Sequence, residues 1–121
     1  MEVPKIFESE YRFCKIMWEN EPVKSGDLVK LCSEQLGWKP TTTYTVIKRL
    51  SERGVLVNEN SVVRALVKED VVRTAEIDDL LEKKFEGSLP AFIAAFARNR
   101  QMSDADIDEV KKLIESMREK K

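Results

Sequence analysis

The stretch that decides the fold runs from Pro40 to Val67 and reads PTTTYTVIKRLSERGVLVNENSVVRALV. Its first half has apolar residues at helical spacing, and consecutive threonines favour a helix start because a Thr hydroxyl can accept an orphan backbone N–H there. After Gly54 the period changes, and two β-branched runs flank the polar residues 58–61. This pattern predicts a helix over about 41–53 followed by a β-hairpin.

Two further helices are expected before this stretch. Segments 9–20 and 25–36 each begin at a serine, the expected N-cap, and each carries an apolar stripe close to 3.6-residue spacing. Pro22 separates them, and Gly37 is expected to end the second. Three short helices followed by a hairpin are the parts of a winged helix-turn-helix, in which the third helix enters the DNA major groove.

The rest of the chain is predicted to be helical. Segments with apolar stripes are expected over 69–86, 88–101 and 103–121. The predicted fold class is therefore mainly α with a small β-hairpin. We expect a winged-helix DNA-binding domain over residues 1–68 and a helical dimerisation domain over residues 69–121.

The C-terminal helices carry more apolar surface than three short helices need to pack on one another. We therefore expect a homodimer that buries much of it, and a self-contained monomeric bundle is the alternative. The residues expected at the dimer interface are Phe92, Ile93, Phe96, Ile107, Val110, Ile114 and Met117.

The third predicted helix has two chemically different faces. Val46, Ile47 and Leu50 share one face with Thr43 and are expected to pack, while the other face carries hydroxyl, phenol and cationic groups. Such groups suit base edges and phosphates of double-stranded DNA. The residues expected to contact DNA are Thr41, Thr42, Tyr44, Thr45, Lys48 and Arg49, with Arg64 reaching phosphate from the hairpin.

Charge is distributed unevenly along the 121 residues. The chain has 21 Lys and Arg against 22 Asp and Glu, yet residues 39–68 hold six basic and two acidic side chains, so the remainder carries a net charge of −5. Phosphates respond mainly to the local surface because the Debye length is about 8 Å at physiological salt. The hairpin tip, 58–61, has no Lys or Arg. We therefore expect the wing to contribute little to phosphate binding.

Composition argues against several function classes. The chain has no His, which excludes Ser/His/Asp and Cys/His nucleophiles and His-ligated metal sites within one chain. Cys14 and Cys32 are too few for a zinc cage and are expected to be buried as small hydrophobes. We expect no enzyme activity and no cofactor. No apolar stretch approaches the roughly 18 to 20 residues of a membrane span and the start has no signal-peptide pattern, so a cytoplasmic protein is expected.

Landmarks along nearly the whole chain resemble one family of regulators. They are Glu8-Ser9-Glu10-Tyr11 through Met17-Trp18 with Pro22-Val23; Trp38-Lys39-Pro40-Thr41-Thr42 with Thr45, Arg49-Leu50 and Gly54-Val55-Leu56; and Phe85-Glu86-Gly87-Ser88-Leu89 with the helix that starts at Ser103. Together they resemble the BlaI/MecI penicillinase-repressor family of winged-helix transcription regulators. The resemblance implies a homodimeric repressor on a dyad-symmetric operator, joined through its C-terminal helices.

The resemblance also assigns some residues and leaves others different. Thr42, Thr45 and Arg49 match the family's recognition-helix pattern, whereas Thr41 stands where members often have Lys. The wing has Val62-Val63 in place of the usual Gly-Arg. The operator sequence is therefore not implied by the resemblance.

Regulation by the family's known routes is not expected here. Family repressors of β-lactam resistance are cleaved at an Asn-Phe bond, and the aligned pair is Ala95-Phe96. The copper-responsive branch has C-terminal Cys-x-Cys pairs, and residues 111–121 contain no Cys. The inducing signal, any upstream sensor and the target genes stay open. The alternative to DNA binding is a winged-helix protein-interaction module that uses its acidic surface and uncharged wing.

Overall fold

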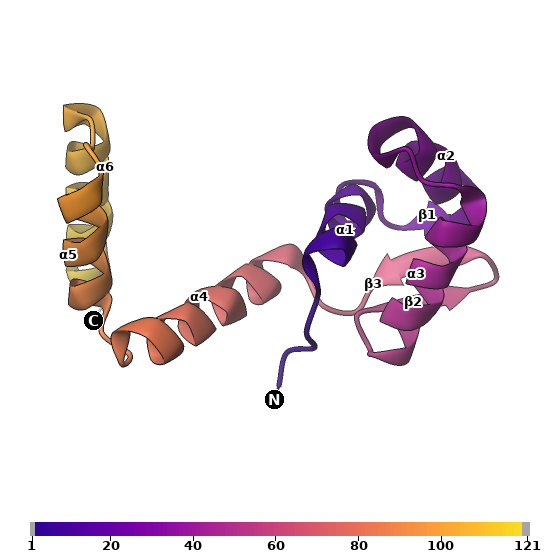
Figure 1. The fold of residues 1–121 in the computed structure, drawn as a ribbon, viewed down its shortest axis with the longest axis horizontal. Helices are drawn as coiled ribbons and strands as arrows, with labels where there is room; N and C mark the ends of the chain where they lie inside the picture. The colour runs from indigo at the N-terminus through magenta and orange to yellow at the C-terminus, as the bar shows by residue number, and fades with distance from the viewer. Residues whose placement is uncertain (1, 120–121) are drawn as a thin grey trace. The chain divides into compact units, whose positions relative to one another are not determined.

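The computed structural model of the chain describes residues 2–119, without the side chains of Asn99 and Glu119. Its elements are, in chain order, α1 Glu8–Asn20, β1 Val23–Lys24, α2 Ser25–Leu36, α3 Pro40–Glu52, β2 Leu56–Glu59, β3 Val62–Ala65, α4 Glu69–Phe85, α5 Leu89–Asn99 and α6 Asp104–Glu119 (Figure 1). The predicted fold class is confirmed. Within the described residues, the helices are too short or too polar to cross a membrane.

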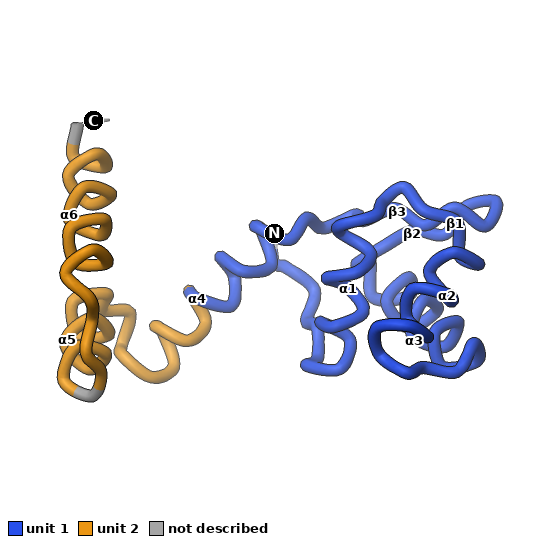
Figure 2. Tube along the Cα trace, turned by 90° about the horizontal axis from the view of Figure 1, so that it is seen from above, with its two compact units in different colours: residues 1–77 blue, residues 78–121 orange. Residues whose placement is uncertain are grey.

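The chain divides into two units, residues 1–77 (unit 1) and residues 78–121 (unit 2), coloured separately in Figure 2. The domain limit expected after residue 68 lies at the start of α4, whereas the division between the units falls within that helix. That limit stays a prediction about which parts fold and act on their own.

The predicted hairpin is present as β2 and β3, which pair antiparallel from Leu56↔Ala65 to Glu59↔Val62. Its loop has only two residues, Asn60 and Ser61, and both have positive φ (53° and 64°), as a type I′ turn requires. The expected four-residue turn was wrong because the polar residues 58 and 59 belong to β2.

A third strand was not predicted. Strand β1 pairs antiparallel with β3 through Val23↔Val63, so the sheet order is β1-β3-β2. Two residues are too few to show the alternating pattern by which strands are recognised in a sequence. Only the fold brings β1 to the edge of β3.

The core of unit 1 lies between helices α1, α2 and α3 and the sheet. On α3 the buried residues are Thr43, Val46, Ile47 and Leu50, which confirms the predicted packing face. The other core residues are Phe13, Cys14, Ile16, Met17, Leu28, Cys32, Val55, Leu56 and Val63.

Both cysteines lie in this core as free thiols, which confirms the expectation that they are buried. Burial raises the pKa of the Cys14 thiol to about 12, helped by the nearby Glu10 charge and opposed by Arg53. Burial also raises the pKa of Cys32. Such thiols are poor nucleophiles. Across residues 2–119, no group of three or more metal-binding side chains is found.

Two predicted N-caps were wrong. Helix α1 begins at Glu8, where Phe7 is the N-cap and its N–H donates to the Glu10 carboxylate at 3.0 Å, so Ser9 lies inside the helix. Ser25 is the first residue of α2, and its N–H donates to the Ser61 carbonyl at 2.8 Å. In neither place does a serine hydroxyl form the N-cap hydrogen bond.

Other helix ends follow the sequence. Gly37 ends α2 with φ 70°, a conformation that glycine adopts at low cost. Ser103 caps α6, since the Asp106 N–H donates to its Oγ at 3.0 Å. The predicted last helix ran through residues 120 and 121, which lie outside the described residues.

Unit 2 has no buried side chain among those described. Helices α5 and α6 lie side by side in both views (Figures 1 and 2). Phe92 contacts Phe85 and Phe96 with ring centroids 5.5 and 6.3 Å apart, and it is only partly covered. By itself, unit 2 therefore leaves most of its apolar surface in water.

One buried polar group in unit 1 generates a stability prediction. The Thr43 hydroxyl is fully buried and has no hydrogen-bond partner of ordinary geometry among the described residues. Beside it lies the Cys32 thiol, whose pKa is raised by burial and lowered in part by Thr43. A thiol is only a weak hydrogen-bonding group. A buried hydroxyl without a partner carries an uncompensated desolvation cost.

We expect Thr43→Val to leave the free energy of unfolding unchanged or raise it by up to about 1 kcal/mol, because valine keeps the shape and removes the unpaired hydroxyl. Urea denaturation followed by the fluorescence of Trp18 and Trp38 measures this change. Thr74→Val on the exposed part of α4 is the matched control and should change stability by less than about 0.5 kcal/mol. A clear destabilisation by Thr43→Val alone would mean that the hydroxyl is satisfied.

Candidate nucleic-acid interface

Helix α3 presents a polar face to solvent because its apolar residues face the core. Pro40 occupies its first turn, where the missing N–H costs nothing. The phenol of Tyr44 is 48% exposed. All six residues that the sequence assigned to DNA contact on this helix are exposed: Thr41, Thr42, Tyr44, Thr45, Lys48 and Arg49. One helix surface therefore brings them together.

The hydroxyl of Thr45 is already oriented. Its Oγ1 donates to the Thr41 carbonyl at 2.8 Å, a bond between successive turns of the helix. The hydroxyl proton is thus used, while the oxygen lone pairs and the γ-methyl group stay available. Thr45 is suited to accept from an exocyclic amino group of adenine or cytosine, or to touch a thymine methyl.

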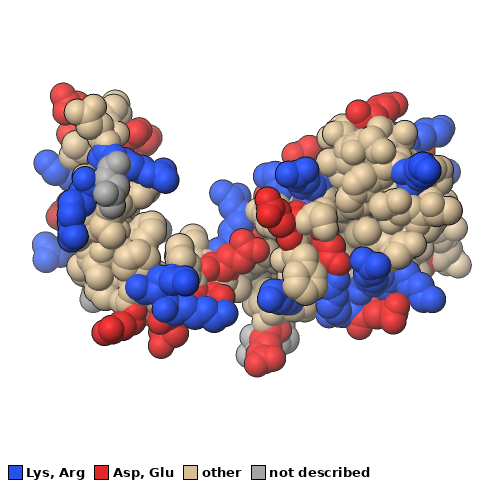
Figure 3. Space-filling view, in the orientation of Figure 1, with Lys and Arg blue, Asp and Glu red and all other residues tan. Residues whose placement is uncertain are grey.

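The positive charge near α3 is smaller than the sequence tally indicates. Three of the six basic residues in 39–68 form ion pairs: Arg53 with Glu10, Arg64 with Glu59, and Lys68 with Glu21. Within residues 2–119, the other three form none: Lys39, Lys48 and Arg49. Figure 3 shows Lys and Arg side chains gathered over the part of unit 1 that holds α3 and the hairpin, with acidic groups among them. The cations free to meet phosphate lie on or next to α3.

Arg64 lies on β3, as the sequence indicated, but it has a partner. Its Nη2 donates to Glu59 Oε1 at 2.9 Å across the hairpin, and both side chains are more than half exposed. An exposed pair of this kind is weak and exchanges with solvent easily. Arg64 can therefore reach a phosphate only by leaving Glu59.

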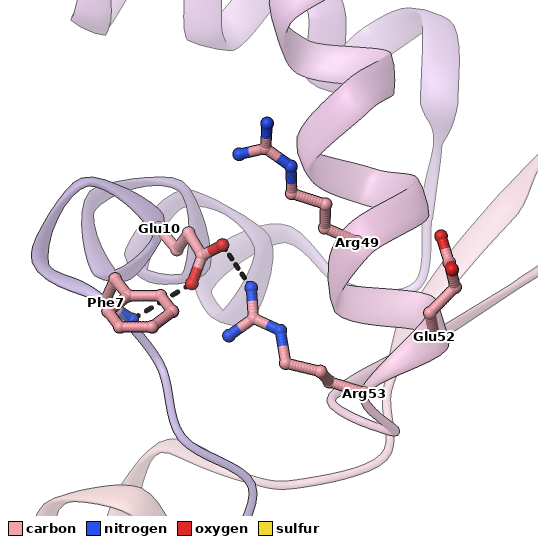
Figure 4. Close-up of a pocket in the computed structure, with 5 residues that line it drawn as sticks. All are labelled: Phe7, Glu10, Arg49, Glu52 and Arg53. Atoms are coloured by element: carbon pink, nitrogen blue, oxygen red, sulfur yellow. Dashed lines mark hydrogen bonds and ion pairs between the residues drawn. The ribbon is translucent and has the colours of Figure 1, made fainter.

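An open pocket of about 440 Å³ lies beside the C-terminal half of α3. Phe7 and Glu10 line it from α1 and its N-cap, and Arg49, Glu52 and Arg53 line it from α3 and its C-cap (Figure 4). The charged groups at its centre are bonded to each other, since Arg53 forms a short hydrogen bond and ion pair with Glu10.

Arg53 ties the start of the chain to the end of α3. Besides bonding to Glu10, its Nη1 donates to the Lys5 carbonyl at 2.7 Å, and its guanidinium lies 5.2 Å from the centre of the Phe7 ring. Sequence reasoning missed this contact. Glu10 three residues after Phe7 is a visible helix-start signal, but nothing in the sequence relates it to a residue 43 positions away.

The Glu10 carboxylate is buried, with 3% of the residue exposed, and its ionisation is set by opposing effects. Burial raises its pKa, while the hydrogen bonds from Arg53 and the Phe7 N–H, with the charges of Arg53 and Arg49, lower it further than burial raises it. The net pKa lies below the ordinary value of 4.5. Glu10 therefore stabilises the fold as an anion.

The residues predicted at the dimer interface lie on α5 and α6. Ile93, Phe96, Ile107, Ile114 and Met117 are 36–71% exposed, while Phe92 and Val110 are partly covered. Leu89 and Leu113 are also exposed (53% and 61%) and were not in the predicted set. Leu113 could have been found, because it follows Val110 by three positions on the same apolar stripe.

Comparisons with known proteins point to one family. The family model described as penicillinase repressor matches residues 6–116. A penicillinase repressor of Bacillus licheniformis is 23% identical over 98% of this chain and 96% of its own length. One from Staphylococcus aureus is 20% identical, over 96% and 95% respectively.

One solved structure is similar in fold. It is the solution structure of the monomeric form of Bacillus licheniformis BlaI in complex with the blaP half-operator. The match has a TM-score of 0.50 and 24% sequence identity, and it covers 58% of this chain and 90% of that one.

The Glu10–Arg53 pair generates a prediction about stability and pH. The pKa of Glu10 is lower in the folded chain than in the unfolded chain, so its ionised carboxylate contributes fully to the free energy of unfolding above pH 4.5. This contribution is lost as pH falls through the pKa of Glu10 in the folded chain. We expect Glu10→Gln to lower the free energy of unfolding at neutral pH by about 1–3 kcal/mol, since Arg53 loses a charged acceptor. Urea denaturation at several pH values measures both effects.

Glu8→Gln, an exposed change on the same helix, is the matched control and should cost at most about 0.5 kcal/mol. The difference in stability between the unmodified chain and Glu10→Gln should shrink as pH falls below 4.5. A difference that stays constant from neutral to acidic pH would show that ionised Glu10 does not stabilise the fold.

Proposed function

The chain belongs to the penicillinase repressor family, and we propose that it represses transcription by binding a dyad-symmetric DNA operator as a homodimer. The observation that carries this proposal is the exposed face of α3, where hydroxyl, phenol and cationic groups stand opposite a fully packed apolar face. Such a helix, held rigidly on a winged-helix unit, suits the major groove. The family is a class of regulators and not of enzymes, so no catalysis enters the mechanism.

The residues of α3 divide into two roles in this proposal. Thr41, Thr42, Tyr44 and Thr45 lie on its first two turns and read base edges. Lys48 and Arg49 lie one turn further on and contact phosphate or guanine. Arg64 supports them from the wing after exchanging Glu59 for a phosphate. Phosphate contacts place the helix in register, and base contacts give specificity.

Dimerisation is supported by the composition of unit 2. Its described side chains include none that is buried, and α5 and α6 expose large apolar residues. A second copy would cover that surface and supply the core that this unit lacks. Two linked recognition helices also convert the second DNA contact into an intramolecular event, which raises affinity without new contacts.

Repression in this proposal is steric, because a dimer on a promoter blocks polymerase. The proposed site of action is the cytoplasm, where the DNA target would lie. The central test is a titration of fluorescently labelled duplex from the gene's own upstream region, at low and moderate salt, against a random duplex of equal length. Preference for the upstream duplex supports the proposal. Absence of binding at both salt concentrations contradicts it and favours the protein-interaction module.

Substitutions on α3 separate the two roles. Thr45→Ala should weaken binding to the preferred duplex by about 1–3 kcal/mol with little effect on random DNA, if Thr45 touches a base. Thr45→Val keeps the methyl group and removes the hydroxyl, so it tells which of them makes the contact. Lys48→Ala should weaken both duplexes alike and reduce the salt slope by roughly one unit. Fluorescence anisotropy measures all three, and equal effects on both duplexes for every variant would refute these assignments.

Ile114→Glu should shift the dimer to monomer, because it places a charge on apolar surface that the partner is proposed to cover. Light scattering at micromolar concentration gives the mass. Ser116→Glu adds the same charge two positions away, on another face of α6, and should leave the mass unchanged. An unmodified chain that is monomeric under these conditions would rule out the proposed dimer.

A further inference from the structure

The segment from Ala65 to Glu69, here called the exit segment, leads from β3 into α4. Each of its residues is bonded to another part of unit 1. Ala65 N–H donates to Glu21 Oε1 at 2.8 Å; the N–H groups of Leu66 and Val67 donate to the Val55 carbonyl at 2.9 and 3.2 Å; the Val67 carbonyl accepts from Trp18 Nε1 at 3.0 Å; Lys68 pairs with Glu21 at 3.0 Å and Glu69 with Lys15 at 2.8 Å. A connection between elements is seldom held at every residue.

Three of these partners come from one side of α1. Lys15, Trp18 and Glu21 are spaced three residues apart, so they lie along one face of that helix and its C-cap. We call these three residues the exit clamp. They contact the exit segment through a salt bridge, an indole N–H and a carboxylate, in that order along α1. Along α1 these contacts meet the exit segment in reverse order, at Glu69, Val67 and Ala65, so the clamp runs antiparallel to the segment that it holds.

The members of the clamp differ in strength. Glu21 has only 13% of its side chain exposed and serves two partners, and Trp18 is partly buried with its ring 5.7 Å from that of Tyr11 in an edge-on contact. The exposed Lys15–Glu69 pair is weaker alone. The hydrogen bond and charge of Glu69 raise the pKa of Lys15. Val72, one turn into α4, is buried with 2% exposed. Together these contacts fix the first turn of α4.

A fixed first turn has consequences at the other end of the helix. Helix α4 has 17 residues and no Pro or Gly to bend it. It is therefore about 25 Å long, and a tilt of about 10° at its start moves its end by about 4 Å. The rise per base pair is about 3.4 Å. A displacement of about 4 Å at the end of α4 is thus comparable in size to the rise of one base pair.

We propose that Lys15, Trp18 and Glu21 are positioning residues that fix the direction in which α4 leaves unit 1, and thereby the half-site spacing that the dimer accepts. This inference rests on the dimeric DNA binding proposed above. The clamp lies on α1, and its residues are not among those assigned to the DNA-contacting face of α3. It therefore acts on the separation of two sites and leaves the reading of each site unchanged.

The test compares spacing preference with single-site affinity. A duplex selected from a random pool by the unmodified full-length chain is rebuilt with one or two base pairs added or removed between its half-sites, and a duplex with one half-site is made beside it. The unmodified chain should prefer its selected spacing by about tenfold or more. In the double variant Lys15→Gln/Trp18→Phe, that preference should fall to about threefold or less, while affinity for the single half-site stays within about twofold.

Two further variants make the result decisive. The variant Lys15→Gln/Lys68→Gln removes two cations whose side chains are 48% and 64% exposed, so it should fold even if the variant with Trp18→Phe does not. It should also lower the spacing preference. Lys83→Gln breaks the Lys83–Asp79 pair of α4 away from the clamp and should change nothing. Retention of the full spacing preference in both clamp variants overturns the proposal. So does an equal loss of preference in Lys83→Gln.

A measurement without DNA separates this inference from the proposed function. Thiol-reactive spin labels are attached at two exposed positions through the substitutions Asn58→Cys and Thr74→Cys, and the native cysteines are buried and should not react. Pulsed electron resonance then reports the distance between the wing and α4. The clamp variants should broaden the distance distribution relative to the unmodified chain, and an unchanged distribution overturns the proposal. If the unmodified chain binds no duplex, the proposed function fails, and this readout still decides whether the clamp fixes α4.

Discussion

The packing of one face of α3 against the core is the constraint on which the rest depends. Val46, Ile47 and Leu50 are removed from water by α1, α2 and the hairpin, and this burial fixes the rotation of α3 about its own axis. Because the helix has a period of 3.6 residues, the rotation also decides which side chains face solvent. The core thus decides which side chains of α3 form the exposed face that is proposed to read DNA.

Ion pairs determine where the remaining charge acts. Arg53 and Lys68 neutralise carboxylates of α1 and its C-cap, and in doing so they tie the end of α3 and the segment after the hairpin to the first helix. The positive charge left on and beside α3 is smaller and more localised than the sequence tally. A local field of this kind aligns a helix on phosphates without making the whole chain basic, which fits an overall charge of −1.

The two units differ in how much apolar surface they bury within themselves. Unit 1 has a closed core and can present polar groups outward, whereas unit 2 has apolar helices with no buried side chain among those described. The first has a closed core of its own, and in the proposed dimer the second gains its hydrophobic stabilisation from a partner. Helix α4 runs from one to the other, and its first turn is the part that the exit clamp contacts.

Periodic patterns in the sequence were enough for the helices, the hairpin and the packed face of α3, because these depend on neighbours a few positions apart. The family was indicated by the resemblance of landmark residues spread along nearly the whole chain. Local patterns also misled, since Ser9 and Ser25 are not caps. The strand β1, the Glu10–Arg53 pair and the contacts of the exit clamp join residues about 40 or more positions apart. Only the tertiary structure decides these, because a carboxylate or an indole N–H has no preferred partner in sequence and bonds to whatever group the packed core brings within reach.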